Sequence, residues 1–218
     1  VLYSYFIEPG ENAVIPFTEG DGDYTVVGYQ QIQGDQYAAL YSETLTVELE
    51  NEFLPFLYPN QYVNFSPDSE ASKLALSMVS ENTSDIDALK QIYNYVVNNL
   101  SYDYDKAETV ETGYLPDVDE TLSTKTGICF DYAALTTAML RSCDIPCKLQ
   151  IGYTGDIKHA WIDVYIRSKG WVTNAVSFNG DSWSLMDPTF DSSADSDDSE
   201  AIQDYIGNAD NYTVQFTR

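Results

Sequence analysis

Histidine occurs once in this sequence of 218 residues, at position 159, so any chemistry that needs an imidazole must use it. The residue begins an alternating run in which His159 and Trp161 share one face of a predicted strand, while Ala160 and Ile162 share the other. The aliphatic face is the expected core face, so His159 should point towards a different layer. A lone histidine is more often structural than catalytic, and that alternative stays open.

Cys129 is the natural counterpart of this histidine, because it follows Gly127-Ile128 and begins a predicted helix that runs to Ser142. The free N–H groups and the dipole at a helix N-terminus favour a thiolate, which predicts a lowered pKa for the cysteine. A nearby imidazole would take the thiol proton. The backbone N–H of Cys129 is then a candidate donor to an oxyanion. The alternative is a buried, unreactive cysteine.

Asp187 could complete such a site, because a histidine that acts as a base needs a carboxylate to hold its tautomer. Pro188 follows it and restricts the backbone of Asp187 to extended conformations. The chain has 35 acidic residues, so Asp187 by itself could equally be a turn residue.

Three segments together resemble the core of the transglutaminase-like superfamily: Gly127–Leu135, His159–Trp161 and Asp187–Phe190. The resemblance covers residues 84–190 and implies a Cys129, His159 and Asp187 triad, with the cysteine on a helix and the other two on adjacent strands. Gly113–Asp117 is similar to a segment of bacterial secreted members. Eukaryotic transglutaminases add an aromatic oxyanion donor before the cysteine helix, and Tyr114 is the candidate for that role here.

The predicted fold class is α+β, with a papain-like or transglutaminase-like core in which the cysteine-bearing helix packs on an antiparallel sheet. A small all-β module should precede it, with residues 1–65 forming the module and 66–218 the core. Four or five short strands are expected in the module, including 24–33, 37–41 and 44–50. Helices are expected after Ser66-Pro67 and after Ser84, a loop over 101–126, and strands over 148–153, 159–166, near 185 and over 212–217.

The composition excludes several classes of function. Acidic residues number 35 against 10 basic ones, a net charge of −25, so binding to nucleic acid or to an anionic membrane is not expected. No apolar run of about 18 residues predicts membrane insertion of this segment. The surface composition favours an extracellular or cell-surface location, with a signal or lipid anchor expected to lie outside this sequence.

Neither a cofactor nor a metal is expected, because the chain has one histidine, no Cys-x-x-Cys and no phosphate-binding glycine loop. The acidic run 191–200 is interpreted as an exposed loop, with a calcium site as the alternative. Cys143 and Cys147 are interpreted as free or buried, with a local disulfide between them left open.

The predicted function is that of a cysteine hydrolase or acyltransferase acting on amide bonds of proteins or peptides, cell-wall peptides among them. Hydrolysis is favoured over crosslinking, because water is present at about 55 M and no dedicated amine channel is visible. The alternative is a non-catalytic binding or scaffold module at a cell surface that keeps the fold.

Overall fold

A five-stranded antiparallel sheet forms the centre of the core in the computed structural model, which describes residues 1–178, 183–185 and 212–218, with side chains described up to 173 and from 212. The strand order is β8-β7-β6-β5-β9, and each neighbouring pair is antiparallel. The bounds are β5 Cys147–Thr154, β6 Ile157–Ile166, β7 Gly170–Phe178, β8 Trp183–Leu185 and β9 Tyr212–Thr217. The four strands predicted over 148–153, 159–166, near 185 and over 212–217 are confirmed as β5, β6, β8 and β9. Strand β7 was not predicted.

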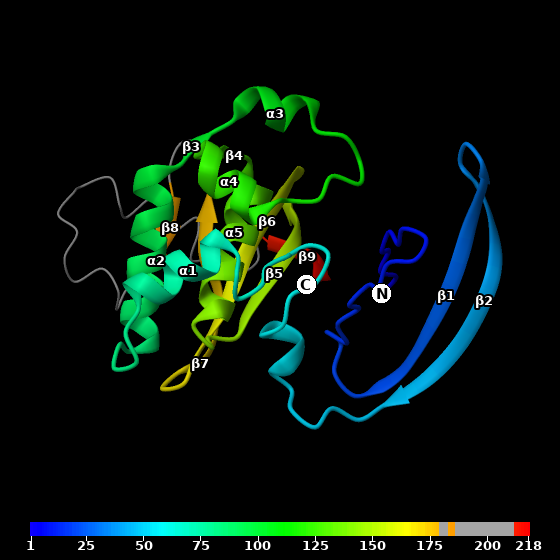
Figure 1. Ribbon diagram of the computed structural model, residues 1–218, viewed down its shortest axis with the longest axis horizontal. Helices are drawn as coiled ribbons and strands as arrows, with labels where there is room; N and C mark the ends of the chain where they lie inside the picture. Colours follow the sequence, from blue (N-terminus) through cyan, green and yellow to red (C-terminus); the bar gives the residue numbers. More distant parts are fainter. Residues whose placement is uncertain (179–182, 186–211) are drawn as a thin grey trace.

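Helix α5 (Cys129–Ser142) packs between this sheet and the other helices, as Figure 1 shows. Its residues Leu135 and Met139 are fully buried, together with Ile162 and Val164 of β6. A helix that is covered on all sides must be apolar around its circumference, which is why apolar density located it in the sequence. The predicted bounds and the helix-on-sheet arrangement are both confirmed.

Two further helices cover α5: α1 (Glu70–Met78) and α2 (Asp85–Asn99). The predicted cap of α2 is confirmed, because the Ser84 hydroxyl accepts a hydrogen bond from the backbone N–H of Asp87 at 3.1 Å. The predicted start of α1 is wrong. Its N-cap is Ser69, while the Ser66 hydroxyl accepts from the N–H of Asp68 in a turn that precedes the helix.

The predicted loop 101–126 instead contains four short elements: β3 Ser101–Tyr102, α3 Tyr104–Thr109, α4 Val118–Thr124 and β4 Thr126–Gly127. Two acidic residues in this stretch are helix caps. Asp103 accepts from the N–H of Lys106 at the start of α3, and Asp117 caps α4. Strands β3 and β4 pair in parallel and thereby bring residues 101–102 beside the start of α5.

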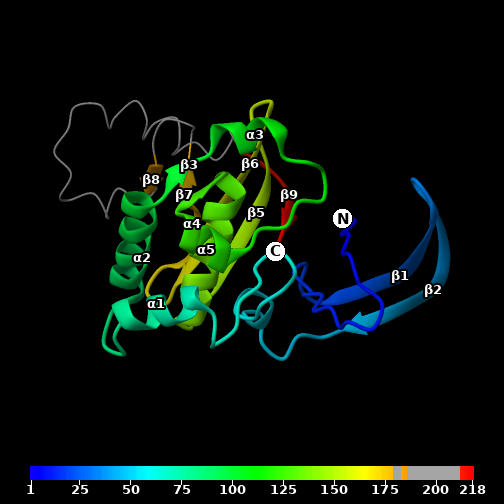
Figure 2. The same ribbon diagram turned by 45° about the horizontal axis from the view of Figure 1, so that its top comes forward.

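The N-terminal module is a single hairpin of β1 (Gly22–Gln33) and β2 (Gln36–Val47), followed by a short 3-10 helix η1 (Leu54–Phe56). The prediction of four or five strands is wrong, because the runs 37–41 and 44–50 belong largely to one strand. Figures 1 and 2 show the hairpin extending away from the sheet and helices. In the alternating run 44–50, Val47 and Leu49 are half-buried between exposed neighbours and Leu45 is 37% exposed. Elsewhere on the hairpin, Ile32 and Leu40 are 68% and 69% exposed.

Both faces of β6 are covered. Ala160 and Ile162 belong to the core, as predicted, but Trp161 and Asp163 on the other face are also buried. His159 at the start of the strand is half-buried. The histidine therefore lies at the margin of the core, where a polar side chain can be partly desolvated and still be accessible to solvent or to a small molecule.

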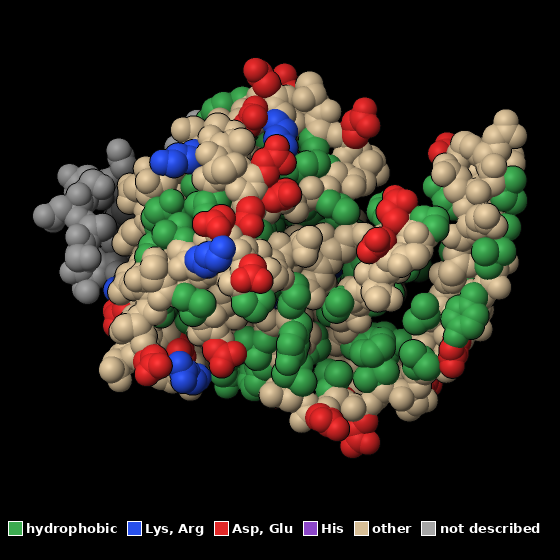
Figure 3. Space-filling view, viewed as in Figure 1, with side chains coloured by type: hydrophobic (Ala, Val, Ile, Leu, Met, Phe, Trp, Pro, Cys, Tyr) green, Lys and Arg blue, Asp and Glu red, His purple; other side chains and the backbone are tan. Residues whose placement is uncertain are grey.

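Acidic side chains outnumber basic ones on the face drawn in Figure 3, in line with the net charge of −25. All three cysteines are free, which decides the question of a Cys143–Cys147 disulfide against the bond. Within the described part of the chain, no helix has both the length and the apolar character needed to cross a bilayer.

Candidate active site

The turn before Cys129 is fixed by Asp131, whose carboxylate accepts a hydrogen bond from the backbone N–H of Ile128 at 2.8 Å. This bond satisfies one of the N–H groups that a helix leaves unpaired at its start. Gly127 is required for the close approach, because a Cβ there would lie 2.6 Å from the Cβ of Asp131. The sequence Gly127-Ile128-Cys129-Phe130-Asp131 thus places Cys129 as the first helical residue.

Asp131 is fully buried and is neutralised by a cation from α3. The Lys106 ammonium donates to Asp131 and to the Tyr114 hydroxyl, each at 2.7 Å, and the Tyr114 hydroxyl donates to Asp131. Burial works to lower the pKa of Lys106, but its bonds to Asp131 and Tyr114 outweigh this and raise it. Hydrogen bonds thus connect helix α3, the segment that carries Tyr114 and the start of α5.

Tyr114 therefore has a structural position that the sequence did not predict. Its pKa is raised to about 12, first by burial and then by its bond to Asp131, so it keeps its proton. That proton is directed at Asp131. The oxyanion role expected for Tyr114 would require this hydrogen bond to break.

The thiol of Cys129 lies against β6. Burial raises the pKa of Cys129, while hydrogen bonds from the backbone N–H groups of Ala160 and Phe130 work in the opposite direction. The predicted lowering of the pKa is therefore wrong in sign. The helix terminus does favour the thiolate, but removal of the sulfur from water favours the neutral thiol more strongly.

His159 immediately precedes Ala160, so the imidazole and the thiol lie on adjacent elements. Its ring stacks near that of Trp161, with centroids 6.3 Å apart and an angle of 18° between the planes. Burial lowers the pKa of His159 to about 4. The imidazole is therefore neutral near pH 7, which is the form that can accept a proton.

The structure does not yet complete the predicted triad. No hydrogen bond among the described residues joins the Cys129 thiol to His159, and Asp187 lies outside the described residues. What the structure places together is the N-terminus of α5 and the part of β6 that carries His159 and Ala160. Direct pairing of the three side chains stays a prediction.

Tyr102 is a residue near the thiol that the sequence analysis missed. Burial raises its pKa to about 12, and its hydroxyl faces the backbone N–H of Cys129. The residue reaches this position through the pairing of β3 with β4, which aligns Tyr102 with Gly127. A parallel pair between segments 25 residues apart gives no local periodicity, so no sequence pattern could have indicated it.

Within the described ranges, no group of three or more His, Cys, Asp or Glu side chains is arranged to hold a metal ion. The acidic run 191–200, the alternative calcium site, falls outside those ranges.

The sequence profile of a known family matches residues 72–188, just over half of the chain, and its description is "Transglutaminase-like superfamily". The chain belongs to the transglutaminase-like superfamily. The match begins in α1 and extends past β8, and it includes Cys129, His159 and Asp187. The earlier resemblance is thereby confirmed at the level of family and fold.

Two curated relatives of this transglutaminase-like chain are much longer than it is. The UPF0252 protein MJ1282 of Methanocaldococcus jannaschii is 40% identical over 62 residues, which cover 26% of this chain and 18% of the relative. The uncharacterized protein YebA of Bacillus subtilis is 24% identical over 183 residues, covering 73% of this chain and 25% of the relative. The chain thus matches about a quarter or less of either protein.

Two solved structures are also similar to this transglutaminase-like domain. A candidate cysteine protease from Cytophaga hutchinsonii has 18% identity and a TM-score of 0.44, over 74% of this chain and 67% of that one. The periplasmic domain of TgpA from Pseudomonas aeruginosa has 18% identity and a TM-score of 0.41, over 51% and 43%.

The low pKa of His159 predicts a specific dependence of stability on pH. Above the unfolded pKa of about 6.5 the residue is neutral in both states and contributes nothing. As pH falls from there towards about 4, only the unfolded chain binds the proton, so the folded state loses stability. Wild type should lose about 2 kcal/mol more than His159→Asn between pH 7.5 and 5. Urea unfolding of both proteins at both pH values measures this, and identical losses would contradict the buried neutral imidazole.

Proposed function

We propose that this domain is a cysteine hydrolase that cleaves amide bonds of proteins or peptides, with Cys129 as nucleophile, His159 as base and Asp187 as the carboxylate that orients His159. The supporting observation is the position of the Cys129 thiol, at the start of a buried helix and against the backbone N–H of Ala160, next to the one histidine of the chain. A structural cysteine would not require this combination.

The pKa directions favour a resting state in which thiol and imidazole are both neutral. His159 would take the proton of Cys129 as the sulfur attacks the substrate carbonyl carbon. The resulting imidazolium would then protonate the amine that leaves, which produces a thioester on Cys129. Water, deprotonated by His159, would attack this thioester and release a carboxylic acid and the free thiol.

The negative oxygen that forms during both attacks needs hydrogen-bond donors. The backbone N–H of Cys129 is the first candidate. Tyr102 is better placed than Tyr114 to be the second, because its hydroxyl faces that same N–H and its pKa of about 12 keeps it protonated. The Tyr102→Phe substitution removes the hydroxyl but keeps the ring, so a lower rate of hydrolysis in this variant would be due to the hydroxyl and not to packing.

Hydrolysis is proposed over transfer to an amine because water is the abundant acceptor. The test incubates the protein with a glutamine-containing peptide and excess labelled cadaverine, and quantifies both products by mass spectrometry. We expect free acid to be the major product. Conjugate well above free acid, and absent with Cys129→Ala, would show an acyltransferase instead.

A second candidate function is a binding module without turnover at a cell surface. The exposed apolar residues of the hairpin, such as Ile32 and Leu40, favour an interaction role for that part of the chain. The two functions differ in two observables. A binding module would leave every offered amide intact, and its Cys129 would react no faster with an alkylating reagent than the other cysteines. The extracellular or cell-surface location is proposed on composition alone.

A further inference from the structure

Residues 3–6 lie beside the end of the sheet, against a surface that includes Gln61, Tyr62 and Arg218 and is called the groove below. Figures 1 and 2 show the segment between the core and the hairpin, close to β9. It has neither helical nor strand structure of its own. Its conformation is therefore set by the groove.

The groove contacts the segment mainly through its backbone. The side-chain amide of Gln61 accepts from the Phe6 N–H at 2.9 Å and donates to the Phe6 carbonyl. The Tyr62 hydroxyl donates to the Ser4 carbonyl at 2.7 Å. One amide that bonds both main-chain groups of a residue reproduces the pairing of a neighbouring β-strand. Such contacts accept an extended peptide with little regard to its sequence.

Alternate side chains of the segment meet Arg218, which is buried. The guanidinium lies over the rings of Tyr3 and Tyr5, 4.4 and 4.9 Å from their centroids, and over the ring of Tyr62 at 4.1 Å. Its Nη1 also donates to the Tyr5 hydroxyl at 3.0 Å. Because successive side chains of an extended chain point in opposite directions, the groove selects aromatic residues at every second position.

The groove leads to the start of α5. The ring of Tyr62 has its centroid 6.4 Å from that of Phe130, the residue after Cys129. The ring centroid of Tyr114 lies 6.3 Å from that of Phe130. The Phe6 ring lies beside Gly113, the residue before Tyr114. The groove thus lies one side-chain contact away from the residue that follows the candidate nucleophile.

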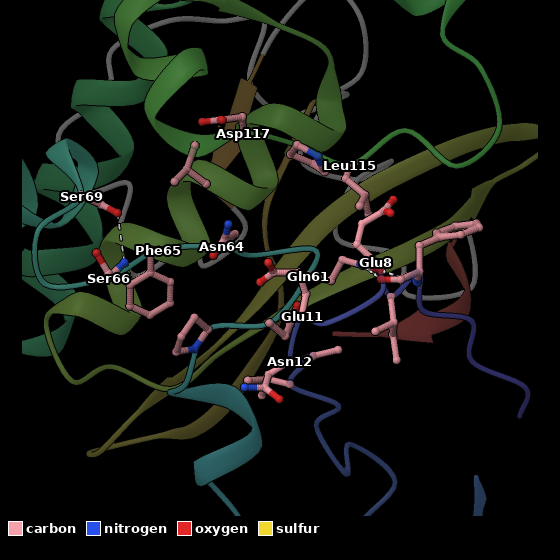
Figure 4. Close-up of a pocket in the computed structure, with 18 of the residues that line it drawn as sticks. Glu8, Glu11, Asn12, Gln61, Asn64, Phe65, Ser66, Ser69, Leu115 and Asp117 are labelled. Atoms are coloured by element: carbon pink, nitrogen blue, oxygen red, sulfur yellow. Dashed lines mark hydrogen bonds between the residues drawn. The ribbon is translucent and has the colours of Figure 1, made fainter. Parts of the chain in front are cut away.

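The segment is only partly covered by the rest of the chain. Phe6 is 58% exposed. Beyond it, the chain borders a cavity of about 750 Å³. Figure 4 shows Glu8 and Gln61 together in this cavity, with Leu115 nearby. A segment with open space beside it can be exchanged for another peptide that makes the same contacts with Gln61, Tyr62 and Arg218.

We propose that the groove of Gln61, Tyr62 and Arg218 is a substrate subsite for an extended peptide with aromatic residues at alternate positions, and that residues 3–6 occupy it in the resting protein. This inference rests on the proposed amide hydrolysis at Cys129. A substrate must displace the resident segment, whose effective concentration is on the order of millimolar. Loosening that segment therefore increases apparent peptide affinity.

The test uses the full chain in a Cys129→Ala background and a fluorescent, amidated peptide with the sequence of residues 1–8. Binding is measured by fluorescence polarisation. The Phe6→Pro substitution removes the N–H that Gln61 accepts and the ring, so it loosens the resident segment. We expect this variant to bind the peptide at least about tenfold more tightly than the protein that retains Phe6.

Adding Gln61→Ala to the Phe6→Pro variant should weaken peptide binding about fivefold or more, because both backbone bonds are lost. The matched control is Gln36→Ala, on the exposed hairpin, which should leave the peptide affinity unchanged. A peptide with proline in place of its phenylalanine should bind more weakly to every variant. Circular dichroism confirms that each variant is folded.

Equal affinity with and without Phe6→Pro, or an affinity unaffected by Gln61→Ala, would overturn the proposal. Both measurements are made without the Cys129 thiol, so they do not depend on catalysis. Tight, Gln61-dependent binding together with no amide cleavage by the wild type would refute the proposed function alone.

Discussion

Cys129→Ala is expected to lower the rate of amide hydrolysis by at least about 10⁴-fold while the fold persists. The reason is that no other group in the proposed mechanism can form the thioester. Cys129 is half-buried and makes no disulfide, so truncation to alanine removes a sulfur and little packing. Release of acid from a glutamine-containing peptide measures the rate, and urea unfolding checks stability.

Cys143→Ala is the matched control, because Cys143 is also half-buried and free but lies at the other end of α5. It should retain activity within about twofold of wild type. Comparable losses of activity in both variants would mean that sulfur at the start of α5 has no special role, and would contradict the assignment of the nucleophile.

Lys106→Met is expected to destabilise the fold by about 3 kcal/mol, the second large effect. Asp131 is fully buried, and this substitution removes its cation while Tyr114 and the Ile128 N–H remain as donors. The carboxylate also holds the turn before Cys129, so activity should fall with stability. Urea unfolding measures the first quantity and hydrolysis the second.

Lys73→Met provides the control for loss of a lysine in an ion pair. Lys73 contacts Glu70 at 2.9 Å, but both side chains are more than half exposed. Exposed pairs contribute little because solvent screens them, so the stability of this variant should stay close to that of wild type. Equal destabilisation by the two substitutions would show that burial of Asp131 is not what makes the Lys106 pair important.

Helix α5 was the most predictable element, because its information is local. Its apolar density, the glycine before it and the stop at Asp144-Ile145-Pro146 all lie within a few residues of its ends. The Ser84 cap of α2 is equally local. The start of α1 was misplaced because Ser66 and Ser69 are both of a type that favours the N-cap, and the sequence alone does not say which residue takes that position.

Features that depend on distant contacts could not be predicted. The pKa of Cys129 was expected to be lowered by the helix terminus, a local effect, but burial against β6 reverses the sign. Tyr102 reaches the site through a parallel pair of two-residue strands, which leaves no periodic pattern. In the hairpin, the local alternation in β2 indicates a strand, but it does not say whether another layer of the protein covers that strand.

Native-state labelling with a limiting amount of iodoacetamide, followed by peptide mapping, tests the central claim most directly. Burial raises the pKa of all three cysteines, that of Cys143 to about 11 and that of Cys147 to about 12. Cys129 differs from the other two because backbone N–H groups donate to its sulfur and a neutral imidazole lies on the adjacent strand. The account predicts that Cys129 is alkylated first and that His159→Ala slows this reaction. Equal labelling of all three cysteines in the folded protein would contradict it.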